Sequence, residues 1–286
     1  MVSDYNPAIR SLGPFLLGVV AALMLYGVEV AQMYHYLRRA IYVKLWIKCL
    51  VLTLFCLETL QITILSCYLY DALITFRTDV FVTEGASWNA WILPLQIILT
   101  GFTAFLAELF FLRTVHVVIR NRLLTCSIFV FGASGLVAGI VFGVTSISIP
   151  KFSQWKKLDS VITTWLVSML IADTLTALSL AWYLGKRRCN TSSSGDVVSR
   201  FISMSLATGM VTSLASIACL VSFMLEGPHL AFDFMLGALY MNSVLSMLNS
   251  RLYDDPDSSE TPSSIGGLQL TDMALDATWR SGALEQ

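Results

Sequence analysis

Charged residues are scarce in this chain, and their scarcity excludes most soluble architectures. Only 13% of the 286 residues are Asp, Glu, Lys or Arg and 56% are hydrophobic, whereas soluble domains carry about 25% charged residues. The formal net charge is −1, so no general attraction makes nucleic acid an expected partner. The alternating segments of about 10 residues that build membrane barrels are also missing. What remains is a helical membrane protein, with the lipid bilayer as its partner.

Motifs that carry catalysis or bind metals are absent as well. The sequence contains no H-E-x-x-H, no G-x-S-x-G, no phosphate-binding loop and no C-x-x-C pair. Its three histidines, His35, His116 and His229, are scattered at the ends of apolar runs. No two cysteines fall in outer loops, so no extracellular disulfide framework is expected. We therefore expect neither enzymatic activity, nor a cofactor, nor a bound metal.

Long apolar runs are what the sequence does contain. About 20 apolar residues cross the roughly 30 Å of a bilayer core, and the run 229–249, which is followed by an acidic, serine-rich tail, has that length. The predicted spans are 13–36, 45–70, 91–112, 123–149, 161–184, 201–225 and 229–249. The fold class is thus all-α, a polytopic membrane protein with seven transmembrane helices in 13–250. An extracellular tail, 1–12, precedes them, and a disordered cytosolic tail, 251–286, follows.

The distribution of basic residues predicts the orientation. Most of the 18 Lys and Arg residues fall in connections on one side of the predicted bundle, and the loop with Lys151, Lys156 and Lys157 is the discordant one. Because basic residues are retained in the cytosol, the N-terminus is expected outside and the C-terminus in the cytosol. We expect the plasma membrane in preference to an internal membrane.

Carboxylates inside the predicted spans are the most informative residues, because each is costly in lipid. No Lys or Arg lies deep in a span to pair with them, but Gln or Thr follows several of them three residues later, on the same helix face. These acids are Glu29, Glu58, Glu108, Asp173 and Asp233. The candidate residues for a ligand or ion site are Glu29, Glu58, Glu108, Asp173, Asn242 and Asn249.

Two interpretations of these acids stay open. In the first, they are neutral carboxylic acids that donate hydrogen bonds to neighbouring helices and so hold the bundle together. In the second, two or more of them line a wet cavity that binds a proton, a metal cation or an amine ligand.

Glycines recur along one face of the fourth predicted span. The pattern Gly135-x-x-x-Gly139-x-x-x-Gly143 lets a second helix approach closely. That second helix belongs either to the same chain or to the partner in a homodimer.

Three runs of residues form a pattern typical of one family. The first span opens with Leu12-Gly13-Pro14-Phe15-Leu16-Leu17-Gly18, and the second with Lys44-Leu45-Trp46-x-Lys48. The last span ends Gly237-x-Leu239-Tyr240-x-Asn242-Ser243-x-Leu245-x-x-Leu248-Asn249-Ser250-Arg251. With these runs the chain resembles a large group of basidiomycete fungal proteins that are predicted to have seven spans and have no assigned activity.

This resemblance is strongest in the C-terminal region, 168–254, which resembles domain of unknown function 6534. Members of that family typically carry Lys after the glycine of the last span, whereas this chain has Ala238. The substitution removes a basic partner for Asp173 or Asp233. The resemblance implies the membrane fold and no particular biochemistry.

Three functions are compatible with these features. A receptor-like or sensory protein fits the seven-span plan and a tail whose Ser and Thr residues are candidates for phosphorylation and for binding a cytosolic partner. A small-solute or proton-coupled transporter would use Glu29, Glu58 and Asp173, although no inverted repeat or broken helix favours it. A structural membrane organiser would use the glycine face as a homodimer seam.

The orientation predicts the fate of the only glycosylation sequon, Asn190-Thr191-Ser192. Because it falls on the cytosolic side, Asn190 should carry no glycan. The measurement is the gel mobility of the full chain, expressed in a glycosylating host, before and after endoglycosidase treatment. A glycan on Asn190 would contradict the orientation.

Overall fold

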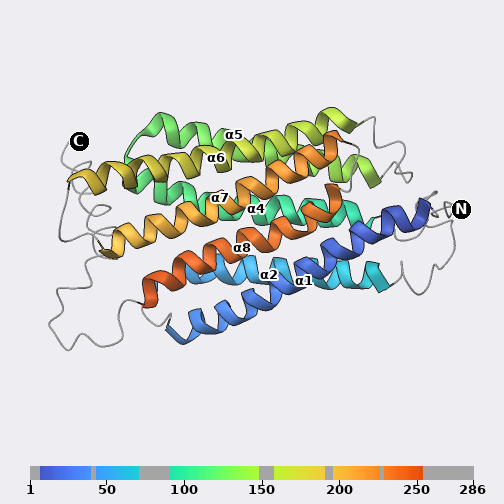
Figure 1. Ribbon diagram of the computed structural model, residues 1–286, viewed down its shortest axis with the longest axis horizontal. Coiled ribbons are helices and arrows are strands. Elements are labelled where there is room, and N and C mark those ends of the chain that lie inside the picture. The colour runs from blue at the N-terminus through green and yellow to red at the C-terminus, as the bar shows by residue number, and fades with distance from the viewer. Residues whose placement is uncertain are drawn as a thin grey trace, which may run out of the picture.

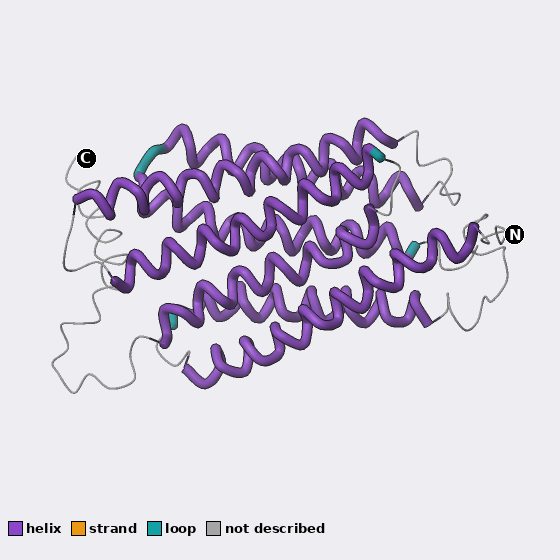
Figure 2. The backbone as a smooth tube through the Cα atoms, in the orientation of Figure 1, coloured by secondary structure: helices purple, strands orange, loops and turns teal. Residues whose placement is uncertain are grey.

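The computed structural model of the chain is a bundle of long helices (Figures 1 and 2). It describes residues 7–39, 43–70, 91–147, 158–190, 196–225 and 229–253. Within these residues the helices are α1 (Pro7–Arg39), α2 (Leu45–Tyr70), α4 (Ile92–Ile119), α5 (Arg122–Ile147), α6 (Asp159–Asn190), α7 (Asp196–Met224) and α8 (His229–Tyr253). The predicted all-α class is confirmed.

Six of these helices are long and apolar enough to cross a membrane. In the seventh, α7, the apolar part that the structure describes, Gly209–Met224, is shorter. Many large apolar side chains are exposed on the outer surface, such as Leu17, Met24, Leu123 and Leu214. A soluble protein rarely exposes so much contiguous apolar surface. These features are those of a multi-pass integral membrane protein.

The order of the helices around the bundle follows from their contacts. Each helix packs against the next along the chain, and α8 closes the ring by packing against α1. A Cβ added to Gly18 of α1 would lie 2.6 Å from the Cα of Ala231 in α8, and Asn242 bonds Glu29 further along both helices. The two helices are therefore parallel, as the first and last of an up-and-down ring of seven must be.

Two helices form the centre of the bundle. In the apolar windows of α4 and α8, 61% and 67% of residues are buried, against 22% in α1. Helix α8 contacts α1, α2, α4 and α7, and α4 contacts α2, α5, α6 and α8. Polar side chains on α4 and α8 are consequently the ones with the most helices within reach.

The third predicted span ends too early. Helix α4 continues beyond residue 112 to Ile119, through residues predicted to be a basic connector. Val115 is fully buried there, and the guanidinium of Arg113 lies over the Trp46 ring of α2, 4.2 Å from its centroid. A long Arg side chain can reach the membrane surface while its helix stays in the bundle, so a single basic residue does not end a span. Arg120, with φ 56°, ends the helix.

Other helix ends also extend past the predicted spans. Helix α1 begins at Pro7, α6 reaches Asn190 and α8 reaches Tyr253. Apolar length marks only the part of a helix that lies in lipid, whereas backbone hydrogen bonding continues into polar residues at the surface. Four predicted features lie outside the described residues. They are the loop 71–90, the segment 150–157 with its three lysines, the part of the sequon after Asn190, and the tail 254–286.

The glycine face of α5 is covered by helices of the same chain. A Cβ on Gly135 would lie 3.1 Å from the side chain of Met169, and one on Gly139 would lie 3.3 Å from Trp165, both in α6. A Cβ on Gly143 would overlap Ile98 of α4. The face therefore seats α4 and α6, and a homodimer would need a different surface.

The close approach of α1 and α8 gives a test with a matched control. Gly18→Ala forces a methyl group into the backbone of Ala231, so it should destabilise the protein by about 1–3 kcal/mol. Gly27→Ala, on the same helix, meets nothing within 4 Å and should stabilise the helix by up to about 1 kcal/mol. Thermal unfolding of both variants in detergent is the measurement. Equal effects would contradict the packing of α1 on α8.

Candidate functional site

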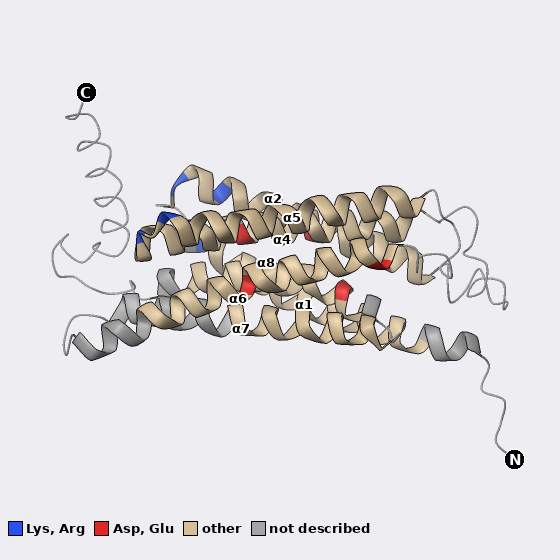
Figure 3. Ribbon diagram, turned by 90° about the horizontal axis from the view of Figure 1, so that it is seen from above, with Lys and Arg blue, Asp and Glu red and all other residues tan. Residues whose placement is uncertain are grey.

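The interior of the bundle is acidic. Five carboxylate side chains are buried, and no Lys, Arg or His is buried among the side chains whose exposure the structure describes. The acids are spread along the length of the helices, whereas the described basic residues gather at one end (Figure 3). The buried acids are Glu29, Glu58, Glu108, Asp173 and Asp233.

The carboxyl groups of Glu108 on α4 and Asp173 on α6 lie within hydrogen-bonding reach of each other. Two carboxylates both lack a proton to donate, so a hydrogen bond between them requires that one is protonated. The hydroxyl of Thr176 donates to Glu108 Oε1 at 2.7 Å. A proton on either carboxyl group would therefore join the two side chains by a hydrogen bond.

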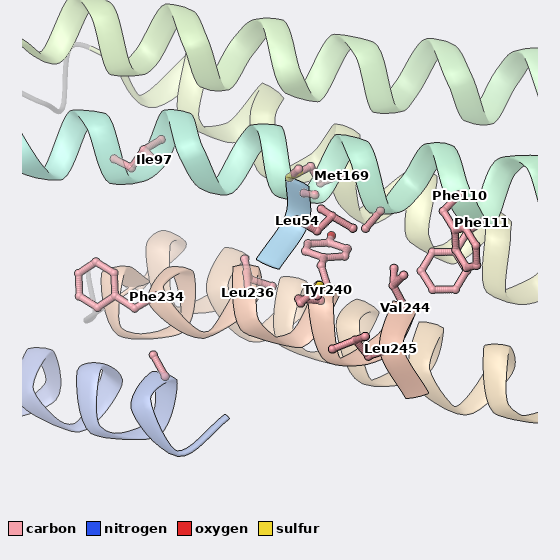
Figure 4. Close-up of a cluster of buried hydrophobic side chains, with 14 of the residues drawn as sticks. Leu54, Ile97, Phe110, Phe111, Met169, Phe234, Leu236, Tyr240, Val244 and Leu245 are labelled. Carbon is pink, nitrogen blue, oxygen red and sulfur yellow. The ribbon is translucent and has the colours of Figure 1, made fainter. Parts of the chain in front are cut away.

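Tyr240 connects this pair to α8. Its hydroxyl donates to Asp173 Oδ2 at 2.6 Å, and Ser216 of α7 donates to the same oxygen at 3.5 Å. Figure 4 shows Tyr240 rising from α8 toward α4 among apolar side chains such as Met169 and Val244. We call Glu108, Asp173, Thr176, Ser216 and Tyr240 the carboxyl-pair cluster. It joins α4, α6, α7 and α8 at one point.

A second group of polar side chains surrounds Gln61 of α2. Its Nε2 donates to Glu58 Oε2 at 3.1 Å and to Thr103 at 2.9 Å. Its Oε1 accepts from Gln96 at 3.1 Å and from Thr100 at 3.0 Å, both on α4. With every hydrogen-bonding atom of its amide occupied, Gln61 fixes α2 against α4.

Gly237 of α8 makes room for this group. A Cβ at that position would lie 2.7 Å from Glu58 Oε2 and 3.2 Å from Gln61 Oε1. Only a glycine allows α8 to approach Glu58 this closely without displacing the carboxylate. Glu58 is therefore enclosed by α2, α4 and α8.

Asparagines of α8 hold α1. The amide of Asn242 donates to Glu29 Oε1 at 3.2 Å and to the carbonyl of Leu25 at 3.1 Å. The amide of Asn249 donates to the carbonyl of Gln32 at 2.9 Å. Within the described part of the chain, several buried acceptors on this seam have no hydrogen-bond partner: Glu29 Oε2, Gln32 Oε1, Asn242 Oδ1 and Asn249 Oδ1.

Asp233 differs from the other four acids. It is 2% exposed, and neither of its carboxylate oxygens has a hydrogen-bond partner among the described residues. It lies in the second turn of α8, near Cys219 of α7. The other four acids each have at least one hydrogen bond.

The structure brings the predicted site residues together in part. Glu108 and Asp173 meet in the carboxyl-pair cluster, and Asn242 meets Glu29. Glu58 bonds Gln61, three residues away, as the shared face predicts. Asn249 of α8 lies near the C-terminal end of α1 and donates a hydrogen bond to the backbone carbonyl of Gln32. No single site contains all six candidates.

Several residues of the site were missed by sequence reasoning. Gln96, Thr100 and Thr103 recur at i, i+4 and i+7 on α4, a signal that was available in the sequence. Tyr240 and Asn242 are two residues apart, so helical spacing alone turns their side chains in different directions. The structure shows which helices they reach, since Tyr240 bonds Asp173 of α6 and Asn242 bonds Glu29 of α1.

The chemistry that this arrangement supports is the binding of protons. Carboxyl groups that share a proton, or have no partner, change their hydrogen bonds when a proton arrives or leaves. In the described part of the chain no three His, Cys, Asp or Glu side chains gather as metal ligands.

The C-terminal region matches a known family. Residues 169–253 match a family of unknown function (DUF6534), which supports the resemblance seen in that region. The match includes Asp173, Ser216, Asp233 and Tyr240 and excludes Glu29, Glu58 and Glu108. No curated protein and no solved structure matches the chain.

The bond between Tyr240 and Asp173 can be tested directly. Tyr240→Phe removes the donor that Asp173 Oδ2 accepts at 2.6 Å and leaves the long bond from Ser216, so it should destabilise the protein by about 1–3 kcal/mol. Tyr70→Phe is the control, because Tyr70 is 59% exposed, and should change stability by less than about 0.5 kcal/mol. Thermal unfolding in detergent measures both. If Tyr240→Phe left the unfolding temperature unchanged, the bond from Tyr240 to Asp173 would not contribute to the cluster.

Proposed function

We propose that the protein is a receptor-like, sensory membrane protein with seven spans, in which the carboxyl-pair cluster sets the arrangement of the helices. The observation that carries this proposal is that one group of five side chains joins α4, α6, α7 and α8 around two neighbouring carboxyl groups. A small change at such a joint alters four helices at once. Receptors need this property, because a local event must change the far end of the bundle.

The basic residues support an orientation suited to a receptor. All Lys and Arg residues with described side chains lie where α1 and α4 end and α2 and α5 begin (Figure 3). These residues are Arg38, Lys44, Lys48, Arg113, Arg120 and Arg122. By the positive-inside rule this end faces the cytosol and the N-terminus faces outside. For the detection of external stimuli we propose the plasma membrane.

The cytosolic tail is the proposed output. Residues 254–286 lie outside the described residues, and the sequence there is rich in Ser, Thr and acidic residues. Phosphorylation would add charge that a cytosolic partner can recognise. Helix α8 connects the carboxyl-pair cluster, through Tyr240, to the start of this tail at Tyr253.

A proton-coupled transporter is the second candidate, and Asp233 is the observation that favours it. A buried carboxylate with no partner is typical of a proton or ion pathway. Against transport, each described helix is continuous, whereas transporter sites usually include interrupted helices. A membrane organiser has less support, because the glycine face of α5 is covered within the chain.

A reporter at the cytosolic end tests the proposed function. Cys126 is exposed near the start of α5 and is labelled with an environment-sensitive dye after the other five cysteines are replaced by alanine. In lipid nanodiscs, Tyr240→Phe should shift the dye emission, because loosening the cluster changes the helix arrangement at the far end. Tyr70→Phe should leave the emission unchanged.

Two results would contradict the receptor-like function. If Tyr240→Phe lowers the unfolding temperature without shifting the dye emission, the cluster is structural only. If proteoliposomes take up a solute and Asp173→Asn abolishes the uptake, the protein is a transporter.

A further inference from the structure

Asp233 has no structural role that its contacts can explain. A buried carboxyl stabilises a helix bundle by hydrogen-bonding a neighbouring helix, and neither oxygen of Asp233 does so within the described residues. Placing it there costs free energy, because a polar group without a partner has lost its hydration. Such a residue inside a membrane is expected to have a function.

Among the side chains that the structure describes, none near Asp233 can neutralise a negative charge. Phe234, its neighbour in the chain, packs edge-on against Phe15 of α1, and Phe15 packs against Tyr68 of α2. The described titratable side chains that neighbouring helices present to α8 are all acids or weak acids. They are Cys219 on α7, Tyr68 and Glu58 on α2, Glu29 on α1, Glu108 on α4 and Asp173 on α6.

Asp233 begins a row of positions on α8 of which the next two face acids on other helices. Positions 233, 237 and 240 fall at i, i+4 and i+7, so they share one helix face. Gly237 lies against Glu58, and Tyr240 bonds Asp173. At a rise of 1.5 Å per residue, these positions are about 6 Å and about 10 Å along the helix from Asp233. Carboxyl groups thus follow one another from the start of α8 to the carboxyl-pair cluster.

The row begins at the end of the bundle opposite the basic residues. Helix α8 runs parallel to α1, and Asp233 lies four residues after the first residue of α8. The described Lys and Arg side chains lie at the other end (Figure 3). A proton from the N-terminal side of the membrane would meet Asp233 before it met Glu58 or the pair.

We propose that Asp233 is a proton-binding site, and that protons reach the Glu108–Asp173 pair from the N-terminal side through Asp233 and Glu58. The proton adds to a carboxylate oxygen of Asp233 to give the neutral acid, which the apolar surroundings accept. From there it passes through intervening water to Glu58 and then to the pair, because neither oxygen of Asp233 bonds another side chain among the described residues, and each donor becomes a carboxylate again. This site would bind protons whether or not the bundle acts as a receptor.

Infrared spectroscopy of the full chain in nanodiscs tests the binding of the proton. At neutral pH, the wild type should show the carbonyl band of protonated carboxylic acids, and Asp233→Asn should remove one component of it. Asp159→Asn is the matched control, because Asp159 is exposed in the first turn of α6, and should leave the band unchanged. Asp233→Glu keeps the acid, so the component should shift without being lost.

The kinetics of deuterium exchange test the route. After transfer to D₂O, the carbonyl band of the Glu108–Asp173 pair should shift at least about tenfold more slowly in Asp233→Asn than in wild type. Asp159→Asn should exchange at the wild-type rate. The component assigned to the pair is identified by its loss in Glu108→Gln.

Three outcomes would overturn the proposal. A carbonyl band that Asp233→Asn does not change would mean that Asp233 is ionised. A component that sodium or potassium chloride abolishes at constant pH would mean that Asp233 binds an alkali cation instead. Exchange at the pair that is equally fast in Asp233→Asn and wild type would mean that protons enter elsewhere. The dye test at Cys126 does not depend on any of these three measurements. Failure of the receptor-like function can therefore be distinguished from failure of the proton site at Asp233.

Discussion

The absence of water from the membrane interior is the constraint on which the rest of this structure depends. A carboxyl or amide group inside the bundle must find its hydrogen bonds on other helices, because lipid offers none. Gln61 uses its whole amide in this way, binding α2 to α4. Asn242 and Asn249 do the same between α8 and α1. These hydrogen bonds fix which faces of the helices meet, which apolar contacts alone would not specify.

Helix α8 has two polar faces with different tasks. One face, with Ala231, Asn242 and Asn249, lies against α1 and holds it in place. The other face, with Asp233, Gly237 and Tyr240, lies toward the helices that bring Glu58, Asp173 and Cys219 near α8. The first face satisfies its amide donors, whereas the second begins with a carboxylate that has no hydrogen-bond partner among the described residues. The face toward α1 thus serves the assembly of the bundle, and the face with Asp233 takes part in the chemistry of its interior.

Small residues decide which acids come together. Gly237 lets α8 approach Glu58, and the glycines of α5 let α6 pack closely, which places Asp173 beside Glu108 of α4. In a soluble protein the hydrophobic effect would supply most of the driving force for such contacts. In lipid, close packing and hydrogen bonds must supply it. The glycines and the two carboxyl groups therefore act together to hold the helices in contact.

The sequence alone determined the class of this protein, since apolar length and the scarcity of charge follow directly from the thickness and polarity of the bilayer. It also identified the acids, because a charge in an apolar run is visible without a structure, and the pairing of Glu58 with Gln61, because helical spacing is local. Only the tertiary structure decided that Glu108 lies beside Asp173, that Tyr240 reaches Asp173 whereas Asn242 reaches Glu29, and that Asp233 has no hydrogen-bond partner among the described residues. These facts depend on how helices far apart in the sequence are rotated against one another, and that rotation is set by close packing at residues such as Gly18 and Gly237, which no local pattern reveals.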